Sequence, residues 1–119
     1  MIEDLALVAL GGAIGAALRV LARSVVIARV HGTWRATLAV NLAGSVVIGL
    51  LAAPLADAPH WRVLLVPGVL GGFTTFSGFA LDVVIAVDER RWRRAATIVA
   101  VTMVACPLAC LLALRGIAG

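Results

Sequence analysis

Charged residues are scarce in this sequence: Asp, Glu, Lys and Arg make up 13% of its 119 residues, whereas soluble domains average about 25%. Hydrophobic residues account for 63% of the chain. A soluble chain of this length forms one small domain, whose interior is too small to bury so much apolar surface. The composition therefore excludes an ordinary soluble domain and indicates that lipid surrounds part of the chain.

Lysine is absent, and all ten basic residues are arginines. Without lysine there is no phosphate-binding P-loop, and the sequence also lacks GxSxG and HExxH motifs. We therefore expect no enzyme active site. The net charge of +4 does not indicate a nucleic-acid partner, because the arginines lie at the ends of apolar segments rather than on one basic face.

Three segments carry no charge and are close to the roughly 20 residues that a helix needs to cross the hydrocarbon core; they are residues 36–56, 63–81 and 95–114. A fourth apolar segment runs from Leu5 to Leu18 and continues as a helical pattern past Arg19. The predicted spans, about 4–28, 36–56, 63–87 and 95–115, form one all-α membrane domain over residues 1–119.

The first span has an alternative interpretation as a cleaved signal peptide. Its charges disfavour that interpretation, because Glu3 and Asp4 stand where a basic stretch belongs and arginines follow the apolar run. All three tryptophans, Trp34, Trp61 and Trp92, lie in the predicted connections. Indole rings anchor helices at the lipid–water interface, so their placement supports the four-span prediction.

The arginines also predict an orientation. The connections at about 29–35 and 88–94 share one side of the membrane and hold six arginines, whereas the other side holds only Arg62 and Arg115. The positive-inside rule then places these two connections in the cytoplasm and both termini outside.

Small residues recur at helical spacing in the first and third spans, as Gly11 and Gly15 and again as Gly68 and Gly72. Such pairs let helix backbones approach closely, although glycine is also simply frequent in membrane helices. Four helices leave little room for a selective path within one chain, so we expect an oligomer.

Two polar residues interrupt the first two spans. Arg19 either extends toward the nearby interface or faces an aqueous vestibule that attracts anions. Asn41 shares a helical face with Thr37 and Ser45, four residues before and after it. This face either makes interhelical hydrogen bonds or forms a polar track whose amide donors meet a solute.

The third span contains the most unusual segment, Gly71–Phe79 (GGFTTFSGF). Two glycines followed by two β-branched threonines make a poor continuous helix, and a break would free backbone groups that are tolerated only in protein or facing a cavity. Phe76 and Phe79 share a face, where their positive ring edges either pack against neighbours or meet an anion.

In the last span, Cys106 and Cys110 flank Pro107. A CxxxC pair without histidines is a weak metal signal, so we interpret both cysteines as packing residues and predict a kink at the proline. Thr102 shares a helical stripe with Cys106 and could line a path.

Taken in order, three segments resemble the motifs of the Fluc/CrcB fluoride channels. Gly11–Arg19 is similar to the family's GGxxGAxxR, Gly32–Ser45 to its GT…TLxVNxxGS, and Gly71–Phe79 to its GGxTTFSTF. The similarity covers nearly the whole chain.

The resemblance implies a multi-pass protein of the cell membrane that passively exports fluoride as an antiparallel dimer of four-helix subunits with a broken third helix. It implies a structural sodium ion, held by the backbone carbonyls of Gly71 and Thr74, and places Arg19 at a vestibule. The fluoride path would include the following side chains: Thr37, Asn41, Ser45, Thr75, Phe76, Ser77, Phe79 and Thr102.

Three positions depart from the family pattern: Gly78 replaces the usual threonine, Asp82 stands where glutamate is common, and Thr102 with Cys106 makes a weaker polar track.

Two alternatives remain open. A small proton-coupled multidrug exporter would need an embedded carboxylate, and we expect Asp82 to lie at a span end. The arginine bias, by contrast, predicts one fixed orientation, so the partner is either a second copy or a homologous subunit of opposite topology. In the latter case this chain could be a non-conducting subunit.

Overall fold

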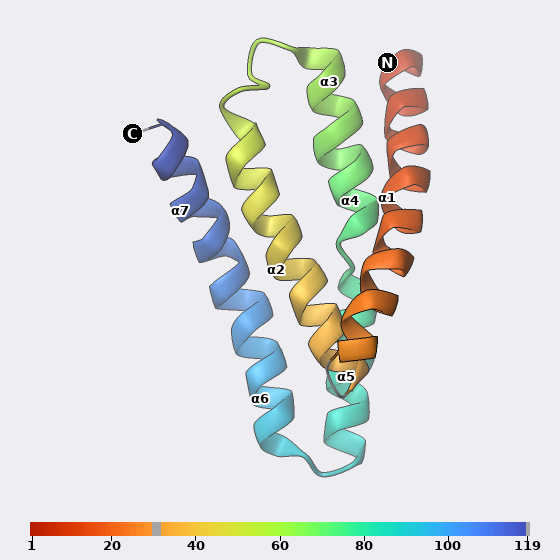
Figure 1. Ribbon diagram of the computed structural model, residues 1–119, viewed down its shortest axis with the longest axis vertical. Coiled ribbons are helices and arrows are strands. Elements are labelled where there is room, and N and C mark those ends of the chain that lie inside the picture. Colours follow the sequence, from red (N-terminus) through yellow and green to blue (C-terminus); the bar gives the residue numbers. More distant parts are fainter. Residues whose placement is uncertain (30–31, 119) are drawn as a thin grey trace.

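The computed structural model describes residues 1–29 and 32–118 and is built of helices (Figure 1). Val30 and His31, in the first predicted connection, lie outside the described residues. The helices are α1 (Ile2–Arg29), α2 (Thr33–Ala52), α3 (Pro59–Val63), the π-helical turn η1 (Leu64–Leu70), α4 (Gly71–Phe73), α5 (Phe76–Asp88), α6 (Trp92–Ala100), the π-helical turn η2 (Val101–Ala105) and α7 (Cys106–Ala118).

Four stretches of the described residues are long and apolar enough to cross a membrane: Ile2–Arg29, Thr33–Ala52, Pro59–Asp88 and Trp92–Gly116. The prediction of an all-α, multi-pass membrane protein is therefore confirmed. The second helix ends at Ala52 rather than near residue 56, because turns follow from Ala53 to Asp57. Pro54 has no backbone N–H to continue the helical hydrogen bonds there.

Successive spans run in opposite directions. Figure 1 shows both termini and the α2–α3 connection at one end, and the α5–α6 connection at the other. The tryptophans occupy the first turns of helices rather than the connections themselves: Trp34 in α2, Trp61 in α3 and Trp92 in α6. Trp61 and Trp92 are exposed, as interfacial anchors require.

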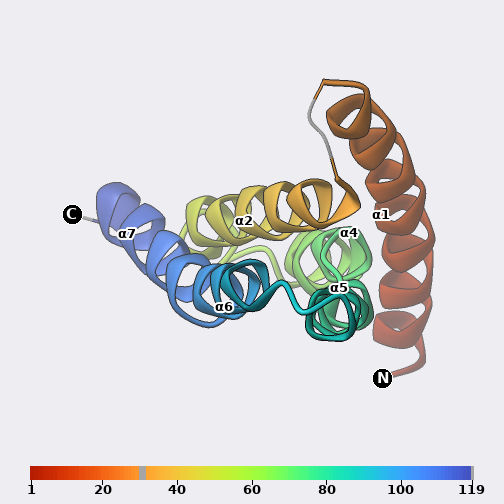
Figure 2. The same ribbon diagram turned by 90° about the horizontal axis from the view of Figure 1, so that it is seen from below.

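Most of the apolar surface of the single chain is uncovered. In the most apolar 18-residue stretch of each span, only 11% to 33% of the residues are buried. A small core forms where α5 meets α6, from Phe79, Ala86, Ala95 and Ile98. Viewed along its long axis, the molecule has α1 on one flank, α7 on the other, and α2 and α4–α5 between them (Figure 2). Lipid or a partner subunit must cover the remaining apolar faces.

The glycine pairs of the first and third spans pack against each other within the chain. A Cβ atom at Gly11 would meet the Leu64 carbonyl oxygen, and one at Gly15 would meet the Val69 carbonyl oxygen. These contacts leave no space for a side chain, so the glycines set how closely α1 approaches η1 and α4. This arrangement confirms the interpretation of the pairs as close-packing surfaces.

Pro67 and Pro107, the two prolines inside the described membrane-spanning segments rather than at their ends, each accompany a change in helical winding. Pro67 lies within η1, and Pro107 is the second residue of α7, directly after η2. Because proline cannot donate a backbone hydrogen bond, the neighbouring turn adopts the wider π-helical pattern. The kink predicted at Pro107 therefore coincides with a π-helical turn.

Neighbouring glycines of α1 provide a matched test of this packing. Gly15→Ala should lower the free energy of unfolding by about 1–3 kcal/mol, because the added methyl overpacks the α1–η1 contact. Gly12→Ala should be neutral or stabilising by up to about 1 kcal/mol, because no atom lies within 4 Å of its added Cβ. Unfolding of both variants in mixed detergent micelles measures the difference, and equal effects would contradict the packing model.

Candidate functional site

The helical winding of the third span is interrupted near its middle. Thr74 (φ −79°, ψ 158°) and Thr75 (φ −143°, ψ 123°) adopt extended backbone conformations between α4 and α5. Gly71 stays helical, with φ −62° and ψ −39°. The interruption thus falls on the two β-branched residues, whose stiff side chains favour extended backbone.

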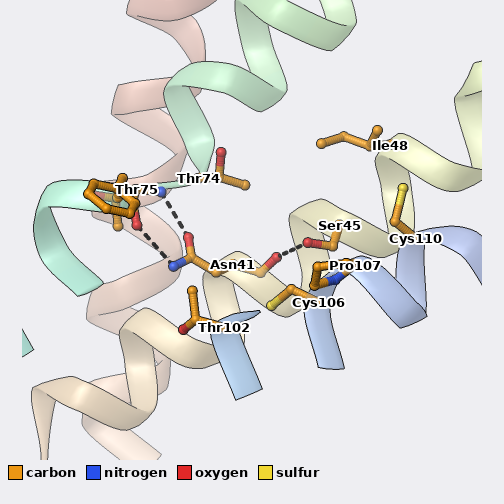
Figure 3. A pocket seen from close by; sticks show the side chains of 10 residues that line it. Asn41, Ser45, Ile48, Thr74, Thr75, Thr102, Cys106, Pro107 and Cys110 are labelled. Carbon is orange, nitrogen blue, oxygen red and sulfur yellow. Dashed lines mark hydrogen bonds between the residues drawn. The ribbon is translucent and has the colours of Figure 1, made fainter. Parts of the chain in front are cut away.

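Asn41 of α2 holds this extended segment by two hydrogen bonds. Its side-chain Nδ2 donates to the Thr75 carbonyl at 3.0 Å, and its Oδ1 accepts from the Thr75 N–H at 2.8 Å (Figure 3). The Asn41 side chain therefore substitutes for helical partners that Thr75 lacks. Asn41 is 6% exposed, so the bonds lie away from bulk solvent. The interpretation of Asn41 as an interhelical hydrogen-bonding residue is confirmed.

Two carbonyl groups lose their helical donors as a result. In a continuous helix the Thr75 N–H would donate to the Gly71 carbonyl, but it donates to Asn41 instead. Similarly, the Gly78 N–H would donate to the Thr74 carbonyl, but it donates at 3.0 Å to the Thr75 Oγ1, which caps α5. Both carbonyls that the family resemblance assigns to sodium therefore have lone pairs free of helical N–H groups.

Arg19 extends from α1 toward the interruption. Its Nη1 donates to the Thr74 carbonyl at 3.3 Å. One turn further along, Arg23 places its Nε in the interior without a hydrogen-bond partner among the described residues. A guanidinium bound to the third span, rather than extended to the helix end, favours the vestibule interpretation of Arg19.

A pocket of about 320 Å³ opens beside the interruption. Its polar lining comes from three membrane-spanning segments: Asn41 and Ser45 of α2, Thr74–Phe76 of the third span, and Thr102 of the fourth span. Figure 3 shows the labelled side chains converging from these segments. Ile48, Cys106, Pro107 and Cys110 complete its wall. Cys106, which was predicted to share a stripe with Thr102, and Cys110, which was predicted as a packing residue, therefore both line the pocket with the polar residues.

The hydroxyl groups of two pocket residues, Ser45 and Thr102, and of nearby Thr37 differ in their hydrogen-bond partners. Ser45 donates to the Asn41 carbonyl at 2.8 Å, and Thr37 donates to the Thr33 carbonyl at 3.3 Å, both within α2. Thr102 buries its Oγ1 without a hydrogen-bond partner in the described part of the chain. Because a hydroxyl has one proton to donate, Thr102 is the one of these three residues whose hydroxyl proton has no acceptor in the described part of the chain.

The two phenylalanines lie together but in different surroundings. Their ring centroids are 5.4 Å apart and the rings are tilted by 54°, within the range of favourable aromatic pairs. Phe76 is 71% exposed and lines the pocket, whereas Phe79 is 6% exposed and belongs to the core. Only Phe76 therefore presents its ring directly to the pocket.

The predicted site residues fall into three groups. Five share the pocket described above with Thr74: Asn41, Ser45, Thr75, Phe76 and Thr102. A second pocket of about 290 Å³ joins Arg19, Thr75 and Ser77 with Arg23 and Gly78. Thr37, Gly71 and Phe79 are not among the residues that line either pocket. Thr75, at the helix interruption, is common to both.

Asp82 does not lie at a span end, as expected from the sequence, and that prediction was wrong. Helix α5 continues to Asp88, so Asp82 sits inside it, 7% exposed. Its Oδ2 has no hydrogen-bond partner among the described residues. It lines a pocket of about 160 Å³ together with Trp34, Glu89 and Arg94. The error arose because a charge-free run ends at the first charge, whereas the helix does not.

These features define a class: a multi-pass membrane protein whose polar pocket is built around an interruption in a membrane-spanning helix. A family model described as "CrcB-like protein, Camphor Resistance (CrcB)" matches residues 6–114. By this match the chain belongs to the CrcB family.

Relatives in several bacteria carry the name fluoride-specific ion channel FluC. One from Caulobacter sp. (strain K31) is 43% identical over 99 residues, covering 78% of this chain and 77% of its own. One from Chelativorans sp. (strain BNC1) is 50% identical over 99 residues, with coverages of 77% and 74%. One from Agrobacterium fabrum (strain C58) is 51% identical over 87 residues, with coverages of 68% and 69%. These relatives are named as ion channels, not as enzymes.

Asn41→Ala should lower the free energy of unfolding by about 1–3 kcal/mol, because it leaves the Thr75 N–H and carbonyl without their partners. Ser45→Ala is the matched control, since it removes only a hydroxyl bonded within α2, and should change stability by about 0.5 kcal/mol or less. Amide hydrogen exchange should accelerate at Thr75 in the first variant alone. Unchanged exchange at Thr75 would show that Asn41 does not hold the interruption.

Proposed function

We propose that this chain is a subunit of a fluoride-selective channel that passively carries fluoride out of the cytoplasm and so reduces its toxicity. The observation that carries the proposal is the pocket beside Thr74–Phe76, where hydrogen-bond donors and an aromatic ring converge at a helix interruption. The names of the relatives, at 43% to 51% identity in the three described above, support fluoride as the ion.

Fluoride is small and firmly hydrated, so its path must replace water with protein donors. Asn41 uses one of its two amide protons on the Thr75 carbonyl, which leaves the second for an ion. Thr102 supplies a hydroxyl without a protein partner among the described residues. Ser45 and Thr37 would first have to rotate away from their helix carbonyls. Asn41 and Thr102 are therefore the principal donors in our proposal.

The phenylalanines complete the path without a fixed charge. Ring edges carry partial positive charge and attract an anion weakly enough for it to leave, as conduction requires. Phe76 would meet the ion directly, while Phe79 supports the Phe76 ring from the core at a centroid distance of 5.4 Å. Arg19, bound to the Thr74 carbonyl, would raise the local anion concentration at the vestibule.

A structural sodium ion fits the freed carbonyls of the third span. Unwound carbonyls at helix interruptions are common ligands for sodium, and the Gly71 and Thr74 carbonyls have both lost their helical N–H donors. Arg19 already donates to the Thr74 carbonyl, so a cation there would use its second lone pair. Bound sodium would supply a fixed positive charge that ties the interrupted segments together.

Two carbonyls from one chain do not fill a sodium coordination shell, which supports a dimer that contributes a second pair. In the family arrangement the subunits are antiparallel. The six-to-two distribution of arginines between the two ends favours one fixed orientation. We therefore extend the proposal to a heterodimer with a homologous subunit of opposite topology, and keep the homodimer as the competing assembly.

The buried carboxylate of Asp82 supports the competing exporter only in part. A proton-coupled exporter requires an embedded acidic residue, and Asp82 is buried. However, Asp82 lies in a separate pocket from Asn41 and Thr102. Passive conduction predicts fluoride efflux that persists when a protonophore abolishes the proton gradient.

If the homodimer conducts, liposomes holding this protein alone should release fluoride much faster than chloride; if the heterodimer is required, only liposomes that also hold the homologous subunit should do so. In the conducting assembly, Phe79→Ile should slow fluoride efflux by about fivefold, because it removes an aromatic pair worth roughly 1 kcal/mol at the path. Phe73→Ile is the matched control, because Phe73 is the one remaining phenylalanine of the chain and lines neither pocket at the interruption. This variant should conduct as the unchanged protein does. A fluoride electrode records the release.

Each outcome of this experiment has a distinct meaning. Fluoride efflux from the single protein contradicts the obligatory heterodimer. An absence of efflux from folded protein contradicts the homodimeric channel and leads to reconstitution with a homologous subunit. Efflux that stops with a protonophore supports the exporter instead.

Sodium should stabilise the assembled protein selectively. At constant ionic strength, replacing potassium by sodium at about 100 times its dissociation constant should add about 2.7 kcal/mol to the free energy of unfolding. Thermal melts in detergent measure the effect. Equal stability in both salts would remove the support for a sodium site, independently of whether fluoride is conducted.

A further inference from the structure

The connection between α5 and α6 concentrates positive charge in a small hollow. Arg90, Arg91, Arg93 and Arg94 flank Trp92, and together these five residues line a pocket of about 570 Å³. The α5–α6 connection lies at the opposite end of the molecule from the termini (Figure 1). The positive-inside rule explains an excess of arginine at such an end, but it requires neither a pocket nor a particular arrangement of the guanidinium groups.

Ion pairing within the chain satisfies only part of this cluster. The Glu89 carboxylate lies 3.4 Å from the Arg91 Nε and 3.8 Å from an Arg94 Nη1. Arg94 also lies 5.3 Å from the centre of the Trp34 ring. Arg90 and Arg93 form no ion pair with any other described residue, although Asp88 is close in sequence. Two exposed guanidinium groups at the pocket therefore remain available to an external anion.

The backbone at Arg90 shows that this placement is costly. Its φ of 58° makes Arg90 the one residue other than glycine with positive φ in the described part of the chain. Glycine would adopt this conformation without steric penalty, whereas a long side chain there is strained. The turn thus positions a guanidinium at a backbone conformation that favours glycine.

We propose that the Arg90–Arg94 pocket binds the phosphate headgroup of an anionic phospholipid. One guanidinium group can donate two parallel hydrogen bonds to two oxygens of a phosphate. Basic pockets between membrane helices bind anionic lipid headgroups. The pocket begins where one membrane span ends and the next starts, so it lies at headgroup depth. Trp92 is 63% exposed, and its indole ring suits the same interfacial layer.

Arg90→Gly separates lipid binding from folding. The substitution relieves the strained backbone, so the thermal midpoint without lipid should stay equal or rise, while affinity for phosphatidylglycerol should fall about fivefold. Arg93→Gln should weaken the same binding to a similar extent without changing the turn. Arg62→Gln, an exposed arginine at the other end of the molecule, is the matched control and should bind phosphatidylglycerol as the unchanged protein does.

Native mass spectrometry from mixed micelles counts the lipids retained on the full-length protein. Preferential retention of phosphatidylglycerol over phosphatidylcholine, reduced by Arg90→Gly and Arg93→Gln but not by Arg62→Gln, supports the proposal. Equal retention of the two lipids, or an equal loss with Arg62→Gln, overturns it. Displacement of the lipid by an equal concentration of inorganic phosphate would show a general phosphate site instead. Lipid retention is read without any fluoride flux, so the result does not depend on the channel function.

Discussion

The pair of hydrogen bonds between Asn41 and Thr75 is the interaction on which the centre of this molecule depends. An interrupted helix within a membrane exposes backbone groups that lipid cannot satisfy. The buried Asn41 amide supplies both a donor and an acceptor to Thr75, so the N–H and carbonyl of Thr75 keep hydrogen-bond partners despite the interruption. The same two bonds divert the Thr75 N–H from Gly71 and fix the orientation of Asn41 beside the pocket. Structure and candidate function therefore rest on one side chain.

Close packing of α1 against the third span places a guanidinium group beside that interruption. Gly11 and Gly15 allow the backbone of α1 to contact η1 and α4 directly, and this approach brings Arg19 within hydrogen-bonding distance of the Thr74 carbonyl. A guanidinium group thus contacts one of the two carbonyls that the interruption frees. In lipid, where no hydrophobic force drives helices together, such backbone contacts must supply the association energy. The wide apolar surface left on the outer helices matches a chain that has lipid or a second subunit as its surroundings.

Hydropathy and charge placed the four spans, because the length of an apolar run is a property of the chain alone. The use of charges as span boundaries failed at Asp82, because this buried carboxylate lies inside α5. Asn41 was recognisable as a polar residue on an apolar helix, but its partner was not, since Thr75 lies 34 positions away in the sequence. Likewise, Cys110 and Ile48 entered the pocket wall through the approach of α2 and α7, which no local pattern reports.

The sequence by itself determined that this is a helical, multi-pass membrane protein, which family it belongs to, and which end carries the arginines, because composition, motif order and charge distribution need no folded chain. Only the tertiary structure decided which polar atoms lack partners. Thr102 and Ser45 look equivalent as hydroxyls on apolar helices. Helix packing buries the Thr102 hydroxyl without an acceptor among the described residues, while the Ser45 hydroxyl donates to a carbonyl of its own helix. The chemistry available at the pocket follows from that difference, since hydrogen-bonding capacity depends on which neighbours the fold brings within about 3 Å.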